Sequence, residues 1–138
     1  MSKESLKILV VASPYPSAEK PYLVPFIHRR AKQLKELGCE IRVVTRSHIS
    51  LGTYFSSWNR VKEHYTNPKN FSYLYDGIEV NGFRTQMLMP LHYSFSTTPM
   101  NINILKDLVM GIKNHFKFDM IQIATWGDFA LAAARIAN

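Results

Sequence analysis

Residues 7–45 read KILVVASPYPSAEKPYLVPFIHRRAKQLKELGCEIRVVT, and this stretch decides the fold. The apolar, β-branched run Ile8–Ala12 has no polar alternation, which is typical of a parallel strand covered on both faces. Apolar side chains then recur at helical spacing from residue 25 or 26 to residue 37, and Gly38 stands where a glycine ends a helix. Glu40–Thr45 reads as the next strand. Strand, helix and strand in this order predict the opening of a doubly wound sheet.

The rest of the chain continues the α/β pattern. The Asp76-Gly77 pair lies between two β-prone runs and predicts a tight β-hairpin. The other segments are an irregular excursion with room for a short helix (47–70), a second amphipathic helix (102–116), a strand (118–124) and an alanine-rich helix that starts at Gly127 and Asp128. We therefore predict an α/β, Rossmann-like doubly wound fold with a mainly parallel sheet and a β-hairpin insertion.

Length and composition indicate one globular domain. The chain has 138 residues, with 46% hydrophobic and 20% charged residues, which is enough apolar material for a sizeable core. Its formal charge of +7 favours an acidic partner: nucleic acid, an anionic membrane face or a phosphorylated substrate. A nucleic-acid-binding module rests on this charge alone, because no helix-turn-helix or aromatic RNA-binding motif is visible.

The single cysteine, Cys39, excludes an internal disulfide and any multi-cysteine zinc site. This usage is typical of a reducing compartment, and the N-terminal apolar run is too short for a signal peptide core or a membrane span. We expect a cytoplasmic protein that meets membranes only as a peripheral protein. Lys and Arg on the first helix, with aromatic residues in 51–75, predict contact with an anionic membrane surface.

Five stretches, taken in order, carry a family resemblance: KILVVA, SPYPSAEKP, FIHRRAKQLKELGCEIRVVT, YDGIEVNGF and FDMIQIATWGDFALAAARIA. They resemble the N-terminal half of GT-B glycosyltransferases, specifically the retaining enzymes of family 4, over nearly the whole chain. The resemblance implies that residues 1–138 form a single Rossmann-like domain, half of a GT-B fold, on the acceptor side of a cleft. It also implies a second, C-terminal domain outside this chain that binds the nucleotide-sugar donor, and we expect the chain to be part of a larger protein.

The resemblance further implies a transferase that moves a sugar from this donor, used as a co-substrate, to a glycan or lipid-linked glycan, as in polysaccharide biosynthesis. Two positions depart from the family pattern. Leu23, Val24 and Pro25 occupy the place of a glycine before the helix, and Gln122-Ile123-Ala124 replaces a histidine-containing motif. No nucleophile and base pair, carboxylate pair or metal-ligand set is readable, so the catalytic residues stay unknown and no metal or further cofactor is predicted. A non-catalytic GT-B-like binding or scaffold domain is the alternative.

The loop from Ser13 to Pro25 lies at the carboxyl end of the first strand, where open α/β sheets bind ligands. It contains no glycine and four prolines, which predicts a stiff wall and not a nest of amides around an anion. Ser13, Tyr15 and Tyr22 are its candidates for contact with the acceptor. The competing interpretation is that this loop only covers the end of the sheet.

Two further pairs are candidate acceptor-binding residues. Arg29 and Arg30, in the first helical turn, can meet a phosphate because helix N-terminal amides add to their charge, or they form a solvated face. Thr125 and Trp126 follow the last strand, where they can contact a sugar, although an aromatic residue after a strand often serves only in packing.

Overall fold

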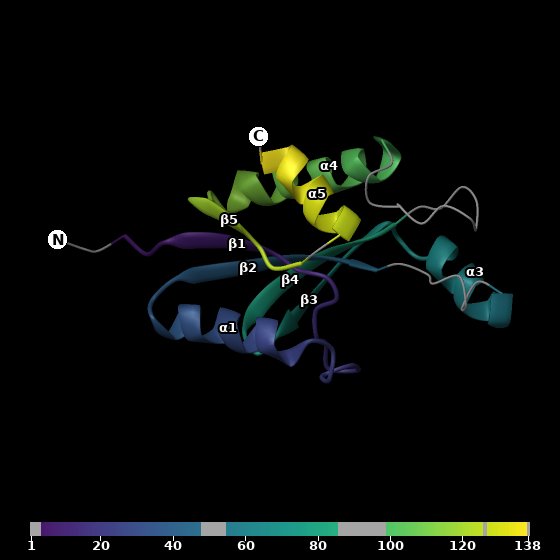
Figure 1. Cartoon of the computed structure of the whole chain (residues 1–138), viewed down its shortest axis with the longest axis horizontal. Helices are drawn as coiled ribbons and strands as arrows, with labels where there is room; N and C mark the ends of the chain where they lie inside the picture. The colour runs from purple at the N-terminus through teal and green to yellow at the C-terminus, as the bar shows by residue number, and fades with distance from the viewer. Residues whose placement is uncertain (1–3, 48–54, 86–98, 126, 138) are drawn as a thin grey trace.

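The computed structural model describes residues 4–47, 55–85, 99–125 and 127–137, and it has an α/β architecture (Figure 1). In chain order the elements are β1 (Lys7–Val11), α1 (Pro25–Glu36), β2 (Glu40–Ser47), α3 (Trp58–Thr66), β3 (Asn70–Tyr75), β4 (Ile78–Arg84), α4 (Pro99–His115), β5 (Met120–Ile123) and α5 (Gly127–Ala137).

The five strands form one mixed sheet in the order β3-β4-β2-β1-β5. Strands β4, β2, β1 and β5 run parallel, and only β3 is antiparallel, at one edge. This mostly parallel sheet agrees with the predicted fold class and is compatible with a Rossmann-like fold. The sequence had predicted the hairpin as an insertion. In the structure its strand β4 is an inner strand of the sheet, paired with β2 from Arg42↔Glu79 to Ser47↔Arg84.

Helices cover both faces of the sheet, as predicted. Alternate side chains of β1 enter two separate cores: Ile8 and Val10 pack with Ala31 of α1, whereas Leu9 and Val11 pack with α4 and α5. Figure 1 shows α1 below the sheet and α4 and α5 above it. A central strand buried on both sides has no polar face, which explains its uninterrupted apolar sequence.

Local signals in the sequence set the ends of α1 and the hairpin turn. Pro25 begins α1, where its missing amide hydrogen costs nothing, and Gly38 follows the helix with a φ of 92°. In the turn between β3 and β4, Asp76 and Gly77 both have positive φ, 48° and 72°. Two consecutive left-handed residues are the mark of a type I′ turn, whose twist matches that of the strands.

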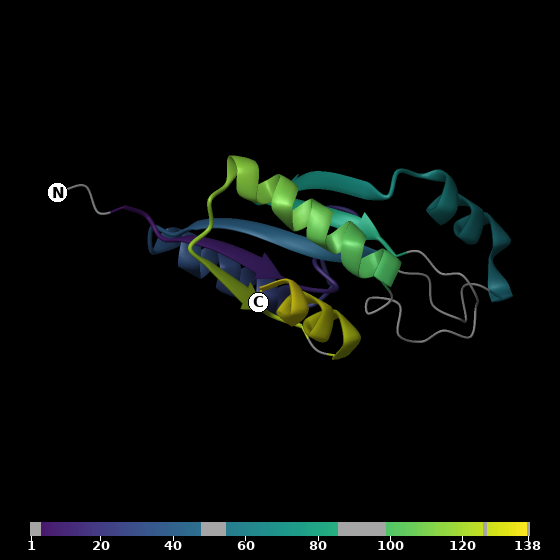
Figure 2. The ribbon, with the colours of Figure 1, turned by 90° about the horizontal axis from the view of Figure 1, so that it is seen from above.

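Helix α3 lies at the carboxyl end of the parallel strands, beyond the sheet (Figure 2). The Nε2 atom of His64 lies 2.9 Å from the carbonyl oxygen of Thr85, just after β4, and this contact holds α3 at that end. Burial lowers the pKa of His64, although its bond to the Thr85 carbonyl opposes this, so the imidazole is neutral at pH 7. Across the described ranges, no helix has the length and apolar character needed to cross a membrane.

Candidate functional site: a crevice at the ends of β1 and β5

Strands β1 and β5 are neighbours in the sheet, but the chain leaves them toward opposite faces. After β1 it passes to α1 on one face, and after β5 it passes to α5 on the other (Figures 1 and 2). Open α/β sheets bind ligands where the connections diverge in this way, outside the carboxyl ends of the strands.

A crevice of about 360 Å³ opens at this place, on the α1 side of the sheet. Most of its lining is apolar: Val10, Pro14, Val24, Phe26, Ile27, Ala31, Ile123 and Ala124. The polar groups are few: Ser13, Arg30, Gln122 and Thr125. An apolar pocket with a small number of polar groups is typical of sites for small molecules.

Backbone hydrogen bonds hold the two strand ends that form the floor of the crevice. The amide of Ala12 donates to the carbonyl of Val44 at 2.9 Å, and the amide of Ala124 donates to the carbonyl of Val11 at 2.7 Å. Beyond them, the Thr125 hydroxyl donates to the carbonyl of Ser13 at 3.3 Å, which ties the loop after β1 to the loop after β5. Ser13 and Thr125, two predicted site residues 112 positions apart, therefore meet at one rim of the crevice. The peptide bond between Ser13 and Pro14 is cis.

The other wall begins with a strained residue. Val24 precedes α1 with a φ of 42° and a ψ of 56°, in the left-handed region that costs a β-branched residue roughly 1–2 kcal/mol. The resemblance had implied a glycine at the place that Leu23, Val24 and Pro25 occupy, and the left-handed backbone of Val24 is one that glycine adopts freely. Helix α1 has no side-chain cap and no acidic residue in its first turn. Arg30, one turn further on, lines the crevice together with Phe26 and Ile27.

The loop between β1 and α1 is fixed from its inner side by a hydrogen-bonded chain of three side chains. The Tyr15 hydroxyl lies 2.7 Å from His28 Nδ1, and His28 Nε2 lies 3.0 Å from Asp76 Oδ2. With the Nε2 hydrogen donated to the carboxylate, Nδ1 accepts from the hydroxyl, so a neutral imidazole satisfies both contacts. Tyr75 packs on the His28 ring with centroids 4.5 Å apart. This Tyr15–His28–Asp76 network joins the loop, α1 and the hairpin turn.

Burial and neighbouring side chains shift the pKa values of Tyr15, Asp76 and the nearby Tyr73. Burial, followed by the nearby Tyr73, Tyr75 and Asp76, raises the pKa of Tyr15 well above its usual range. The hydrogen bond from His28 lowers the pKa of Asp76, and Lys32, whose Nζ lies 3.5 Å from Oδ2, acts in the same direction. Burial, with a smaller effect of Tyr75, raises the pKa of Tyr73 to about 12. Its hydroxyl donates to the carbonyl of Pro16 at 3.0 Å, a second tie on the loop.

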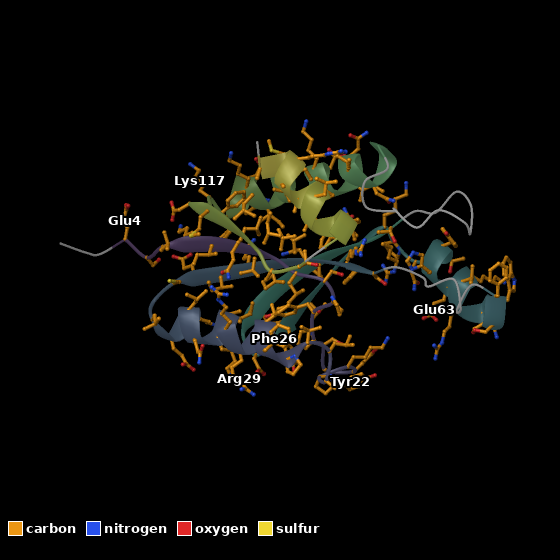
Figure 3. All side chains as sticks on the ribbon, viewed as in Figure 1. Glu4, Tyr22, Phe26, Arg29, Glu63 and Lys117 are labelled. Atoms are coloured by element: carbon orange, nitrogen blue, oxygen red, sulfur yellow. The ribbon has the colours of Figure 1, made fainter. Side chains whose placement is uncertain are left out.

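The structure brings three of the predicted site residues together in the crevice: Ser13, Arg30 and Thr125. It places Tyr15 elsewhere, because only 4% of this residue is exposed and its hydroxyl is bound to His28. Tyr22 is 71% exposed and does not line the crevice. Figure 3 shows Tyr22 on the outer side of the molecule, away from the sheet. Trp126 lies outside the described residues.

Arg29 also lies away from the crevice, although it is adjacent to Arg30 in sequence. It lines a shallow hollow near Asp76, together with His28, Lys32 and Gln33. Successive residues of a helix point about 100° apart, so the two arginines reach different sides of α1.

Sequence reasoning missed several residues at these sites. Gln122 and Ile123 line the crevice but were considered only as replacements for histidines. Asp76 was assigned to the hairpin turn alone, and its bond to His28 spans 48 positions. No local sequence pattern predicts such a bond, since the left-handed turn alone is enough to explain why an aspartate occurs at position 76.

The crevice can bind and orient a ligand more readily than it can transform one. Its polar lining consists of two hydroxyls, an amide and a guanidinium, and none of these lining groups is a carboxylate or an imidazole. Arginine stays protonated and cannot act as a base. No group of three or more possible metal-ligating side chains occurs in the described part of the chain.

Comparisons of the chain with models of protein families, with curated proteins and with solved structures found no match.

Proposed function

We propose that the crevice is the acceptor side of a retaining, family 4-like glycosyltransferase that transfers a sugar from a nucleotide-sugar donor to a glycan or lipid-linked glycan. The single observation that carries the proposal is the composition and position of the crevice. It lies at the divergence of β1 and β5, and it sets Ser13, Thr125 and Arg30 around a largely apolar wall. The order of motifs in the sequence supports the same function.

The crevice chemistry suits an acceptor that is partly apolar. Hydroxyl and amide groups bond to sugar hydroxyls, the apolar wall covers a ring face or a hydrocarbon segment, and the guanidinium binds a phosphate. A cavity of about 360 Å³ has room for a sugar ring or a short alkyl segment. It has no room for both of these and a nucleotide at the same time.

The donor is assigned to a second domain. Pro14, Pro16, Pro21 and Pro25 have no amide hydrogen, so the loop after β1 offers few donors to a diphosphate. In this proposal the domain described here positions and orients the acceptor. Such positioning supplies a large part of the lowering of the activation barrier in a two-substrate reaction. Stabilisation of the departing diphosphate comes from the other domain.

Binding to this chain is tested by NMR titration of the isotope-labelled protein with three probes: octyl β-glucoside below its micelle concentration, decyl phosphate and UDP-glucose. The two amphiphiles should shift the signals of Ile27, Ile123 and Thr125, and UDP-glucose should not bind saturably there. If UDP-glucose binds in the crevice more tightly than the amphiphiles, the crevice is a donor site. If none of the probes binds, the acceptor proposal fails.

The two adjacent arginines provide a matched pair of variants. Arg30→Gln should weaken the binding of decyl phosphate about tenfold, the size of one charge-assisted hydrogen bond, and change that of octyl β-glucoside little. Arg29→Gln removes the same charge outside the crevice and should leave both affinities near the wild-type values. Equal losses in the two variants would indicate a nonspecific effect of net charge.

A non-catalytic binding domain is the second candidate, favoured by the lack of a carboxylate or imidazole among the lining residues. The two functions differ in turnover. Labelled sugar should pass from a nucleotide sugar to an amphiphilic acceptor when a donor-binding domain is present in the same protein. Saturable acceptor binding without transfer under those conditions would favour the binding domain.

A further inference from the structure

Gln122 lies in the floor of the crevice. It belongs to β5 and pairs with Val10 of β1. Side chains of a strand alternate between faces, and Ala124 packs into the core on the α1 side while Ile121 packs into the core on the other side. Gln122 therefore faces α1, and it lines the crevice as a half-buried residue.

The amide of Gln122 is a polar group that the fold leaves uncommitted. Within the described part of the chain, the Gln122 side chain makes no hydrogen bond. The Thr125 hydroxyl, by contrast, donates to the carbonyl of Ser13, and the Arg30 guanidinium can only donate. A glutamine amide offers two N–H donors and one carbonyl acceptor in a single plane. It can therefore bond to a ligand without first giving up a bond within the protein.

The surroundings of this amide restrict the group that it can bind. Its neighbours Val10, Ala31 and Ala124 are apolar, and two of them carry only a methyl group. A hydrocarbon placed over Gln122 would bury the amide without a partner, which is unfavourable. A phosphate or a carboxylate pairs with the guanidinium of Arg30 in preference to a neutral amide. A hydroxyl can bond to the amide but has no apolar part to cover the floor.

An acetamido group meets both requirements, because its carbonyl oxygen accepts a hydrogen bond from the Gln122 amide and its methyl group covers the apolar floor. From these features we infer that the crevice binds an N-acetylated amino sugar and that Gln122 recognises its acetamido group. The inference rests on the proposed function, since it names the class of acceptor for the same crevice. It makes Gln122 the residue that separates N-acetylated sugars from sugars with a hydroxyl at the same carbon.

The test uses two amphiphiles that differ only at carbon 2 of the sugar: octyl β-glucoside, with a hydroxyl, and octyl N-acetyl-β-glucosaminide, with an acetamido group. Both are titrated below their micelle concentrations into the isotope-labelled chain. The wild type should bind the acetamido compound about tenfold more tightly, because a carbonyl acceptor and a buried methyl group replace the hydroxyl. The side-chain amide signals of Gln122 should shift with this compound and much less with the glucoside.

The position of the acetyl group is measured on the same wild-type complex. Nuclear Overhauser contacts should join the acetyl methyl protons to the methyl group of Ala124 and to the side-chain amide of Gln122. This measurement needs no variant, so it does not depend on how a substitution affects folding. Acetyl contacts to Phe26 alone, which is 68% exposed on α1 (Figure 3), would place the group away from the floor and overturn the inference.

Two variants of Gln122 separate hydrogen bonding from shape. Gln122→Met keeps the length of the side chain and removes its donors and acceptor. The preference should then fall from about tenfold to about twofold, because the gain from the methyl group is offset by a ligand carbonyl without a partner. Gln122→Glu keeps an acceptor but loses the donors, and its charge faces the ligand carbonyl, so this variant should lose the preference as well.

The matched control is Gln33→Met. It removes the same amide from an exposed residue that lines the hollow near Asp76 and not the crevice, so the preference should stay near the wild-type value. The affinity of Gln122→Met for octyl β-glucoside should change by less than about threefold, since at most one neutral hydrogen bond is lost. The backbone amide spectrum of each variant verifies folding.

The outcomes separate this inference from the proposed function. Equal, saturable binding of the two amphiphiles to the wild type would overturn the acetamido assignment and leave the acceptor crevice standing. A tenfold preference that persists in Gln122→Met would also overturn it, because another residue would then recognise the group. Binding of neither amphiphile would refute the proposed function and, with it, this inference.

Discussion

Replacing Tyr15 by phenylalanine isolates one hydrogen bond of the Tyr15–His28–Asp76 network. The change removes the hydroxyl that lies 2.7 Å from His28 Nδ1 and keeps the ring, whose centroid lies 5.6 Å from that of the imidazole. Tyr15 and His28 are only 4% and 7% exposed, so bulk water does not replace the lost partner. A buried polar group left without a partner costs about 1–3 kcal/mol, and we expect the free energy of unfolding to fall by about 2 kcal/mol.

Urea unfolding followed by circular dichroism measures this loss. The slope of the free energy against urea should not change, because the same surface is exposed on unfolding. The matched control is Tyr22→Phe, which removes the same hydroxyl from a residue that is 71% exposed, and it should stay within about 0.5 kcal/mol of the wild type. A Tyr15→Phe protein as stable as Tyr22→Phe would refute the reasoning.

Asp76, at the other end of the network, makes part of this stability depend on pH. Its pKa is lowered in the folded state, first by the hydrogen bond from His28. Its contribution is therefore fully present above the unfolded-state pKa of about 4 and is lost as pH falls through the lower folded-state pKa. Asp76→Asn tolerates the left-handed turn and removes the charge. The variant should be less stable than the wild type at neutral pH, with a difference that closes in acid; a difference independent of pH would contradict this.

Three further predictions concern other parts of the domain. Val24→Gly should raise the free energy of unfolding by about 0.5–1 kcal/mol in urea because it relieves the left-handed strain, whereas Val24→Ala keeps the strain and should lower it. Gly82→Ala should destabilise by about 1–3 kcal/mol, since an added methyl group overlaps the Phe71 ring, and Phe71→Leu should recover part of the loss if this overlap is the cause. His64 has a lowered pKa, so the unfolded chain binds its proton more readily and stability should fall below pH about 6.5; His64→Gln should flatten that part of the pH profile measured by thermal melts.

Most regular elements of this protein could be predicted because each has a local cause, whereas α3 lies in a segment (47–70) for which the sequence indicated only room for a short helix. The unbroken apolar run at Ile8–Ala12, the helical spacing between Pro25 and Leu37 and the Asp76-Gly77 turn all act within a few positions of the chain. The apolar periodicity of 102–116 predicted α4 for the same reason. Element ends shifted by a few residues, because they depend on hydrogen bonds to neighbouring strands and turns.

The site could be predicted only in part. Ser13, Arg30 and Thr125 were found because strand ends and helix starts mark the ligand-binding edge of an α/β sheet. Tyr15 was assigned to the same edge, but a loop of prolines has no period that tells which side chains face inward. Its direction is decided by His28, whose ring is held in turn by a carboxylate 48 positions away.

The sequence by itself determined the strands, the helices other than α3 and the tight turn, since propensity, periodicity and turn chemistry act over short distances. Only the tertiary structure decided that the hairpin adds an inner strand beside β2, that Arg29 and Arg30 serve different sides of α1, and that β1 and β5 share one crevice. These outcomes depend on which surfaces are buried against each other. Burial is a property of the assembled layers and not of any one segment of the chain.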